Sequence, residues 1–401
     1  MVRPMELSIV MPCLNEARTL PTCIEKATKF LKESGVVGEI IVADNGSTDG
    51  SIEIAKSLGA RVVNVPIKGY GAALSAGIHA AEGMYVIMGD SDDSYNFLGL
   101  QPFVDKLREG FELVMGNRFL GGIMPNAMPI SHRFFGNPML TALGRRIYEN
   151  DVCGDFYCGL RGFSKAAIER LSIQSTGMEF ALEMIIKAQL YQLKITEVPT
   201  TLSVDGRDRK PHLKTYRDGW RSLRLYLLMS PRWTFGLPGI VSVLLGGILF
   251  AASFFGLLPA AWALVVVILS SAAMVLGFQA ILLAIFAKFI AIETGLHPPA
   301  SRFWMLRDEG TLERFLIAGG VLVAVSLIFV GFMGWNFAHS SRDVRNDYAN
   351  IYHTFLALVS LLFAGQTIIG GFTFGILRLV GERRQFPRKR AADGSASKRI
   401  R

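Results

Sequence analysis

Short apolar runs and amphipathic stretches alternate along the first 120 residues of the chain. Apolar runs of strand length lie at residues 7–11, 39–43, 61–65 and 84–90. Polar loops follow these runs, and after the first one apolar side chains recur at helical spacing from Leu20 to Leu31. Repeated strand and helix units favour right-handed crossovers and a mostly parallel sheet with helices on both faces. The pattern predicts an α/β domain, with a further strand at 112–116.

The second half of the chain carries four apolar runs that are long enough for helices to cross a bilayer. These runs lie at 234–259, 260–287, 315–338 and 351–377. Only a turn containing Pro259 separates the first two, which predicts a helical hairpin. We therefore expect an α/β domain at 1–206, a basic juxtamembrane segment at 207–233, a transmembrane domain of four helices at 234–378 and a basic, disordered tail at 379–401.

Composition and charge support a membrane protein. Hydrophobic residues make up 51% of the 401 residues, more than a soluble enzyme ordinarily contains. The formal net charge is +9, and many of the cations flank the apolar spans, where they would meet anionic lipid rather than nucleic acid. The loop at 288–314 has four Lys and Arg residues and the segment 378–401 has nine, whereas the turn at 257–262 has none.

This asymmetry predicts a multi-pass protein of the cell's inner membrane, with both termini and the α/β domain in the cytosol. No signal peptide is expected, because residues 1–6 lead directly into the first strand. The four cysteines, Cys13, Cys23, Cys153 and Cys158, lack the spacing of a zinc site. We expect them to be reduced and structural.

Three carboxylates follow the fourth predicted strand, at Asp90, Asp92 and Asp93. Ligands bind beyond the carboxyl ends of the strands in an open parallel sheet. Asp90 and Asp92 are one residue apart, which in an extended segment points both side chains the same way, so that they can share a divalent cation. Such a cation completes its shell with water and phosphate oxygens, which points to a nucleoside diphosphate. The alternative is an acidic turn that caps the next helix.

Polar loops after the other strands, at 12–16, 44–50 and 68–71, would lie over the same edge. The glycines of the third loop allow close approach of backbone amides to a phosphate or to the helix start. This loop matches neither the dinucleotide-binding glycine pattern nor a P-loop.

Later segments leave two alternatives open. The apolar positions Phe134, Phe135, Met139, Leu140 and Leu143 predict an amphipathic helix that lies either on the bilayer surface or in the core. A turn-rich stretch follows at 151–163. Beyond it, Glu179 and Glu183 share one helical face, for which a structural, solvated role is the simpler interpretation.

A cationic belt precedes the first membrane span. Eight Lys and Arg residues against two acids lie between Arg207 and Arg232. A juxtamembrane position suits either capture of a lipid phosphate or simple attraction to anionic head groups.

Taken together, these loops resemble those of the family 2 glycosyltransferases, and within them the polyprenyl-phosphate and dolichyl-phosphate sugar synthases, which include bactoprenol glucosyltransferases and dolichyl-phosphate mannose or glucose synthases. The resemblance covers about residues 7 to 233. It rests on five ordered motifs: Pro12-Cys13-Leu14-Asn15-Glu16, Asp44-Asn45-Gly46-Ser47-Thr48-Asp49-Gly50, Lys68-Gly69-Tyr70-Gly71, Asp90-Ser91-Asp92 and Gly159-Leu160-Arg161.

The resemblance implies a GT-A-type, Rossmann-like domain that binds a nucleotide sugar. It assigns nucleotide binding to Pro12, Glu16, Asp44, Lys68 and Asp90, and Mg²⁺ or Mn²⁺ to Asp90 and Asp92. Catalysis is assigned to Asp92, Arg118 and Arg161, and the acceptor phosphate to Arg207, Arg209 and Lys214. The acceptor, a polyprenyl phosphate, is an anion at neutral pH, so its attack on the sugar needs no protein base.

One departure bears on the donor. Several mannosyl-transferring relatives carry Gln after the acidic motif, whereas this chain has Asp93-Ser94-Tyr95. We therefore favour UDP-glucose over GDP-mannose.

Two other functions stay open. Processive polysaccharide synthases also join this domain to membrane helices, but they normally carry Gln-x-x-Arg-Trp, and the nearest segment, 229–233, lacks the Gln. A non-catalytic membrane scaffold with a nucleotide-binding domain is the third hypothesis, which the intact acidic motif argues against. A homo-oligomer is compatible with any of the three functions.

Overall fold

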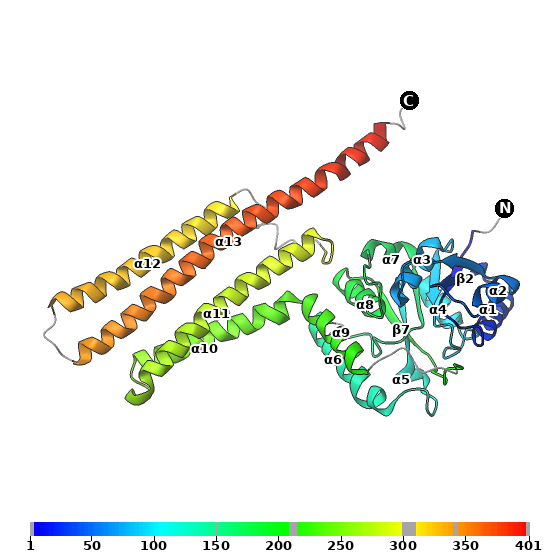
Figure 1. Ribbon diagram of the computed structural model, residues 1–401, viewed down its shortest axis with the longest axis horizontal. Helices are drawn as coiled ribbons and strands as arrows, with labels where there is room; N and C mark the ends of the chain where they lie inside the picture. Colours follow the sequence, from blue (N-terminus) through cyan, green and yellow to red (C-terminus); the bar gives the residue numbers. More distant parts are fainter. Residues whose placement is uncertain (1–3, 150, 208–214, 299–309, 340–343, 398–401) are drawn as a thin grey trace. The chain divides into compact units, whose positions relative to one another are not determined.

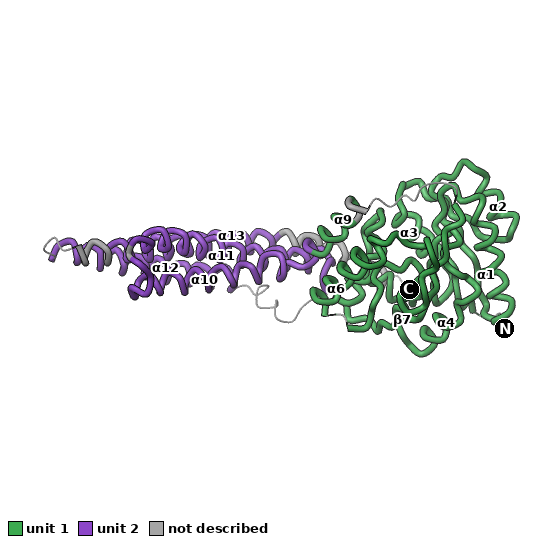
Figure 2. Tube along the Cα trace, turned by 90° about the horizontal axis from the view of Figure 1, so that it is seen from below, with its two compact units in different colours: residues 1–226 green, residues 227–401 purple. Residues whose placement is uncertain are grey.

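The computed structural model describes residues 4–149, 151–207, 215–298, 310–339 and 344–397. The chain divides into two compact units, Met1–Tyr226 and Leu227–Arg401 (Figure 2). Unit 1 extends beyond residue 206, the predicted end of the α/β domain, because most of helix α9 (Thr215–Leu228) belongs to it. The Tyr226 side chain of α9 is fully buried, and its carbonyl oxygen accepts a hydrogen bond from the Tyr148 hydroxyl at 3.1 Å.

Unit 1 is built on a seven-stranded sheet with the strand order β3-β2-β1-β4-β6-β5-β7 (Figure 1). The strands are β1 (Leu7–Cys13), β2 (Gly38–Asp44), β3 (Arg61–Asn64), β4 (Tyr85–Met88), β5 (Leu113–Asn117), β6 (Arg161–Ser164) and β7 (Ile195–Pro199). Neighbours among β1 to β4 pair in parallel, and only β6 runs antiparallel, to both β4 and β5. The predicted α/β fold with a mostly parallel sheet is confirmed.

Helices connect the strands and cover both faces of the sheet. They are α1 (Leu20–Ser34), α2 (Ser51–Ser57), α3 (Tyr70–Ala80), α4 (Gln101–Arg108), α5 (Arg118–Gly121), the π-helical turn η1 (His132–Gly136), α6 (Asn137–Tyr148), α7 (Lys165–Leu171) and α8 (Phe180–Leu190). All seven residues of β1 are buried. Ile9 shares a core cluster with Leu20 of α1 and Phe103 of α4, whereas Val10 points to the other face and contacts Gly77 of α3. Alternate residues of one apolar strand thus hold both helical layers.

Two strands were not predicted from the sequence. β6 lies at the end of the stretch expected to be turn-rich. β7 follows α8 after only a short connection, with no long polar loop before it. Both are short and neither shows a clear apolar alternation, so periodicity could not identify them. β6 is held by its neighbours, since Gly162 pairs with Ile87 of β4 and Val114 of β5.

The second unit contains four long helices. These are α10 (Leu237–Phe254), which continues the π-helical turn η2 (Arg232–Gly236), α11 (Ala260–Glu293), α12 (Thr311–His339) and α13 (Val344–Ser397). Among the residues that the structure describes, four segments are long and apolar enough to span a membrane: Arg232–Phe254, Ala261–Glu293, Thr311–His339 and Asn350–Leu379. The predicted number and order of the spans are confirmed.

Helix α13 continues to Ser397 and so covers most of the segment that we expected to be disordered. Arg, Lys, Ala and Gln residues of this segment favour a helix, whereas Pro387 and Gly394 oppose one. Within unit 2, Phe374 of α13 packs on Phe286 and Phe289 of α11 and on Phe315 of α12, at ring distances of 4.7, 5.5 and 5.5 Å. These contacts join the two helical pairs.

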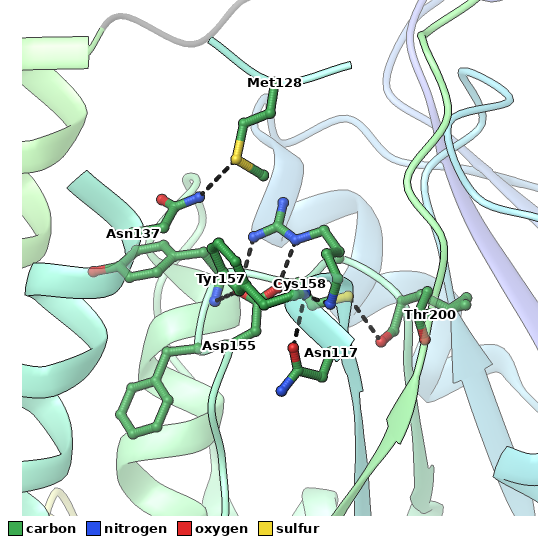
Figure 3. A network of polar contacts seen from close by, with 12 residues as sticks. Asn117, Met128, Asn137, Asp155, Tyr157, Cys158 and Thr200 are labelled. Atoms are coloured by element: carbon green, nitrogen blue, oxygen red, sulfur yellow. Dashed lines mark hydrogen bonds and ion pairs between the residues drawn. The ribbon is translucent and has the colours of Figure 1, made fainter. Parts of the chain in front are cut away.

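A buried polar network fixes the carboxyl end of β5 (Figure 3). Asn117 caps α5 by accepting bonds from the amides of Phe119 and Leu120, at 2.9 and 3.1 Å. The next residue, Arg118, forms a bidentate ion pair with Asp155, from Nε to Oδ2 at 2.6 Å and from Nη2 to Oδ1 at 2.8 Å. Asp155 is fully buried, so the pair is enclosed by protein and each charge depends on the other.

We expect Asp155→Asn to destabilise unit 1 by about 3–5 kcal/mol, because it leaves the buried Arg118 guanidinium without its counter-ion. Thermal unfolding of the purified protein in detergent should show this loss as a fall in Tm. Glu109→Gln is the matched control, since Glu109 pairs with Lys106 on the surface at 2.8 Å, where loss of a pair costs at most about 1 kcal/mol. Equal Tm values for both variants would contradict the structural importance of the buried pair.

Candidate functional site

The loops that follow β1 and β2 are joined by hydrogen bonds into one polar rim. The Asn15 amide donates to Ser47 Oγ at 2.8 Å, and the Thr48 amide donates to Asn15 Oδ1 at 2.8 Å. Asn15 takes a left-handed backbone conformation with φ 57°. The Glu16 amide donates to Ser51 Oγ at 3.0 Å. The predicted nucleotide-binding loops therefore lie together at the carboxyl edge of the sheet, as their positions after parallel strands require.

Asp44 and Lys68, both predicted to bind the nucleotide, lie in adjoining loops. The buried Asp44 carboxylate accepts bonds from the amides of Gly46 and Ser47, at 2.8 and 3.1 Å, and so closes a tight turn. Lys68 Nζ donates to the Asn45 carbonyl oxygen at 2.6 Å and lies against the Cα of Gly46, where a side chain would collide with it. Lys68 thus supplies a positive charge to the rim.

The glycines at the start of α3 serve close packing against a neighbouring loop. The Ala72 amide donates to the Thr176 carbonyl oxygen at 3.0 Å, and a side chain on Gly69 or Gly71 would collide with the carbonyls of Thr176 or Ser175. Of the two roles that the sequence allowed for these glycines, the structure shows approach of the backbone at the helix start.

That neighbouring loop is held by Glu183. Its carboxylate forms an ion pair with Lys187 at 2.7 Å and accepts a bond from the Ser175 amide at 2.8 Å. Glu183 and Lys187 are both buried, so the predicted structural role is right and the predicted solvation is wrong for Glu183. Glu179 is more accessible and lies 3.6 Å from Arg221 of α9.

Asp90 lies at the centre of the rim. Its Oδ1 accepts a hydrogen bond from the Tyr70 hydroxyl at 2.9 Å, and its Oδ2 lies against Gly159, where a Cβ would come within 2.7 Å. Although Asp90 is partly exposed, desolvation of its carboxyl group and the charge of Asp92 raise its pKa to about 6. A raised pKa means that the protein loses stability as the pH rises from the ordinary pKa of an aspartate through about 6, because Asp90 then ionises at an unfavourable site. A cation beside Asp90 would remove this cost.

Asp92 and Asp93 differ in accessibility and partners. Asp92 is buried, and its Oδ1 accepts bonds from the Ser94 hydroxyl at 2.6 Å and the Ser94 amide at 3.1 Å. Asp93 takes a left-handed conformation with φ 61° and pairs with Lys26 of α1 at 2.6 Å. Both residues after Asp92 therefore already have partners. Ser94 supports Asp92, and Asp93 pairs with Lys26.

Arg207 joins two of the predicted site carboxylates. Its guanidinium lies 2.8 Å from Glu16 Oε1 and 3.0 Å from Asp92 Oδ2. The preceding residue, Gly206, donates its amide to the Asp92 carbonyl oxygen at 3.0 Å, which anchors this segment over the acidic loop. Arg209 and Lys214, the other predicted acceptor ligands, lie outside the described residues.

The two aspartates fit a divalent cation as a partial ligand set. Within the described part of the chain, no three His, Cys, Asp or Glu side chains gather as in an all-protein metal centre. Asp90 and Asp92 repel one another, and small divalent cations such as Mg²⁺ are commonly held by one or two carboxylates with water and substrate phosphates. The donor set thus fits a cation that binds together with a diphosphate.

The two arginines predicted to be catalytic are both held by buried polar contacts. Arg118 is engaged by Asp155, as described above. Arg161 is fully buried in β6, and its guanidinium donates to the carbonyl oxygens of Cys158, Phe156 and Ala181. These bonds give both arginines a structural role. The charge of Arg118 also opposes the rise in the pKa of Asp90, and the assignment of the two arginines to catalysis stays a prediction.

Tyr70 and Tyr95 were not predicted to be site residues. Tyr70 binds Asp90 directly, and the buried Tyr95 hydroxyl accepts a hydrogen bond from the Gly159 amide at 2.8 Å, which holds Gly159 beside Asp90. Tyr70 belongs to a motif that was noted for its glycines, and because this motif follows a strand, its expected place at the same sheet edge as Asp90 could have identified it. No local pattern marks Tyr95, whose partner lies 64 residues away in sequence.

Comparison with solved structures places the chain beside glucosyl-3-phosphoglycerate synthase from Mycobacterium tuberculosis. The complex of that enzyme with Mn²⁺, UDP and glucosyl-3-phosphoglycerate aligns at 26% identity and a TM-score of 0.43, over 56% of this chain and 78% of that one.

Two proteins of Haloferax volcanii are similar in sequence. The low-salt glycan biosynthesis hexosyltransferase Agl6 is 32% identical over 92% of this chain and 89% of its own length. A dolichyl-phosphate hexose transferase is 25% identical over 48% of this chain and 81% of its own length.

Two family models also match. Residues 8–172 match the glycosyl transferase family 2 domain, and residues 285–378 match the C-terminal transmembrane region of family 2 glycosyltransferases. The first match contains nearly all of β1, β2 to β6 and the acidic loop, and the second contains all of α12 and the apolar part of α13. The chain therefore belongs to the family 2 glycosyltransferases.

Proposed function

We propose that this glycosyltransferase transfers a hexose from a nucleoside diphosphate sugar to a polyprenyl phosphate at the membrane surface. The observation that carries the proposal is the pair Asp90 and Asp92, held together beside Arg207 at the end of β4. The four candidate membrane spans and the name of the dolichyl-phosphate hexose transferase from Haloferax volcanii support a lipid acceptor.

In the proposed reaction an oxygen of the lipid phosphate attacks the anomeric carbon, and the bond from that carbon to the diphosphate breaks. The electron pair of this bond leaves with the nucleoside diphosphate, so a sugar phosphodiester forms and no protein base is needed. A Mg²⁺ or Mn²⁺ ion on Asp90 and Asp92 would neutralise the charge that develops on the leaving diphosphate. Lys68, which brings a positive charge to the rim, would help to orient the diphosphate of the donor.

UDP-glucose is the donor that we propose. Ser94 and Asp93 are engaged by Asp92 and Lys26, so the position after the acidic motif offers no further cation ligand of the Gln type. This departure from the mannosyl-transferring relatives is the support for a different sugar. Pro12, Glu16 and Asp44 are proposed to contact the nucleoside because their loops form the rim next to Asp90.

The experiment that tests this function is an assay of purified protein in detergent with a panel of labelled nucleotide sugars and polyprenyl phosphate. Mass spectrometry should identify a polyprenyl-phosphate hexose, made fastest from UDP-glucose in the presence of Mg²⁺ or Mn²⁺. A polymer product would favour a processive synthase. Absence of any metal-dependent affinity for UDP or GDP would favour a scaffold, and equal activity on a water-soluble sugar would refute the lipid acceptor.

Asp92→Asn should lower turnover by about 10²-fold or more at saturating Mg²⁺ or Mn²⁺, because it removes an anionic cation ligand. Asp93→Asn is the matched control, since it changes the neighbouring carboxylate, whose described partner is Lys26 on α1. Steady-state kinetics with equal Tm values for the two variants separates chemistry from folding. Similar activity of both variants would remove Asp92 from the proposed cation site.

We propose that the Arg207 guanidinium leaves Asp92 and binds the acceptor phosphate when substrates bind. A metal cation on Asp92 would compete with the guanidinium for the same carboxylate. We expect Arg207→Ala to bind Mn²⁺ alone more tightly than wild type and yet to need at least about 10-fold more lipid acceptor for half-maximal rate. Titration of Mn²⁺ and acceptor-dependence of the rate measure the two effects. Arg224→Ala, an exposed cation of the same belt, is the control and should leave both values near wild type.

We also propose that both termini and the segment between α11 and α12 are cytosolic, in accord with the distribution of Lys and Arg. Only the turns near Pro259 and Ser340 would then be exposed outside. Single cysteines at positions 300 and 395 should resist a membrane-impermeant maleimide applied to intact cells, whereas a cysteine at 259 should react. Labelling of position 300 or 395 from outside would overturn this topology.

A further inference from the structure

A lysine of unit 2 places its ammonium group among membrane helices without an anionic partner. Lys288 is half-buried near the carboxyl end of α11, inside the candidate span Ala261–Glu293. Among the described residues, the hydrogen-bond partner of its ammonium group is the ring nitrogen Nδ1 of His297, and no carboxylate pairs with it. An ammonium group can donate three hydrogen bonds. A lysine inside a membrane span ordinarily faces a partner or a binding site, because an unpaired charge in apolar surroundings is costly.

Helices α10 and α11 form a hairpin, and Lys288 lies on the side of α11 that faces α10 and η2 (Figure 1). A side chain on Gly239 would collide with the carbonyl oxygen of Gly277, and Ala284 lies against Gly236. Gly277, Ala284 and Lys288 are spaced by seven and four residues, which keeps them on one face of a helix. The ammonium group therefore lies at the end of the hairpin where η2 begins.

A buried histidine fixes the orientation of Lys288. His297 is 4% exposed, and its backbone amide donates to the Ala291 carbonyl oxygen at 2.9 Å, which folds the chain back after α11. His297 Nε2 lies 2.9 Å from the carbonyl oxygen of Met229. Because that oxygen can only accept, Nε2 carries the proton, and Nδ1 accepts a hydrogen bond from the Lys288 ammonium group. The imidazole thus directs the cation without neutralising its charge.

The Met229 carbonyl oxygen is available because the hydrogen bonds of η2 begin one residue later. The amides of Trp233 and Thr234 both donate to the Ser230 carbonyl oxygen, at 3.0 and 3.1 Å. The regular helical donor to Met229 would be the amide of Trp233, which is already used. His297 takes its place and joins the end of α11 to the start of η2.

Lys288 lies at the depth of lipid phosphates when its span is centred in a bilayer. The span Ala261–Glu293 has 33 residues. Lys288 lies 11 residues beyond its midpoint, residue 277, which is about 16 Å along a helix at about 1.5 Å per residue. The hydrocarbon core ends about 15 Å from the bilayer centre, and the head groups begin there. Phosphate groups of lipids are anions that occur at this depth.

We propose that Lys288, oriented by His297, binds the phosphate group of a membrane lipid between the end of α11 and η2. A lipid phosphate supplies both the negative charge and the acceptor oxygens that the other N–H groups of the ammonium need. A lysine that served only as a flexible anchor would need no buried imidazole to direct it.

Two kinds of lipid carry this chemistry, an anionic phospholipid such as phosphatidylglycerol and a polyprenyl phosphate. The second source rests on the proposed function, in which polyprenyl phosphate is the acceptor, whereas the first does not. Loss of phosphatidylglycerol binding alone would identify a resident phospholipid. Loss of polyprenyl phosphate binding, with a raised KM for this lipid and an unchanged KM for the nucleotide sugar, would identify the acceptor.

Native mass spectrometry of the delipidated full chain in detergent tests the site with phosphatidylglycerol and polyprenyl phosphate as probes. Diacylglycerol and unphosphorylated polyprenol control for binding of the apolar chains. We expect Lys288→Gln to weaken binding of at least one phosphate lipid by about 10-fold or more and to leave the phosphate-free lipids unaffected. Lys288→Arg keeps the charge and should restore most of the affinity. Because binding is measured without a sugar donor, the result does not depend on which reaction the protein catalyses.

Arg314→Gln is the matched control. Arg314 is an exposed cation in the first turn of α12, so the variant loses the same charge at the end of another candidate span. Its affinity for both phosphate lipids should stay within about two-fold of wild type. Wild-type binding of both phosphate lipids by Lys288→Gln, or equal losses in the Lys288 and Arg314 variants, would overturn the proposal.

Acetylation of the wild-type protein provides a measurement that needs no variant. Brief treatment with acetic anhydride, followed by peptide mass spectrometry, reports how accessible each lysine amine is. Phosphatidylglycerol or polyprenyl phosphate should slow acetylation of Lys288 by about three-fold or more, whereas the phosphate-free lipids should not. Lys32, exposed on α1, should react at one rate throughout. Equal rates at Lys288 with and without the phosphate lipids would refute the site, even if Lys288→Gln proved unstable.

Discussion

The proximity of two carboxylates at the end of β4 is the constraint on which the site depends. Asp90 and Asp92 repel one another, and desolvation makes the charged form of Asp90 still less favourable. Tyr70 stabilises Asp90 through its hydroxyl, and Arg207 offsets the charge of Asp92. These two contacts compensate only part of the repulsion, which is why the aspartates are suited to a cation and a diphosphate that arrive together. Membership of the glycosyltransferase family and the repulsion between the two aspartates both favour a nucleoside diphosphate sugar as the ligand of this site.

Around this pair, the protein uses buried polar contacts to hold loops in place. Asp155 pairs with Arg118, and Glu183 pairs with Lys187, each in a position that water does not reach freely. Such pairs are a poor source of net stability, but loss of one partner is costly, so they oppose any rearrangement of the loops they join. The result is an acidic loop whose supports are rigid, whereas Arg207 is joined to it by ion pairs that a phosphate could replace.

The apolar surface of unit 2 suits the membrane in the proposed function. The helices of unit 2 expose large aliphatic and aromatic side chains over lengths that suit a bilayer. A soluble acceptor would not require these spans, whereas a lipid phosphate is confined to the membrane that they would cross.

Local patterns in the sequence were sufficient for features that depend on local physics. Apolar runs predicted β1, β2, β4 and β5, because strands buried on both faces are largely apolar, and they also predicted β3 at the edge of the sheet. Uninterrupted apolar length alone predicted the four spans. The loops that carry Asp44 and Asp90 were predicted because parallel strands end at one edge. Contacts between distant residues were decided by the tertiary structure alone. Arg118 and Arg161 appear as free cations in the sequence, but folding brings Asp155 and three backbone carbonyls to them. Arg207 meets Glu16 across 191 residues. A charge takes its role from the groups that surround it after folding, and no periodicity along the chain records which groups those are.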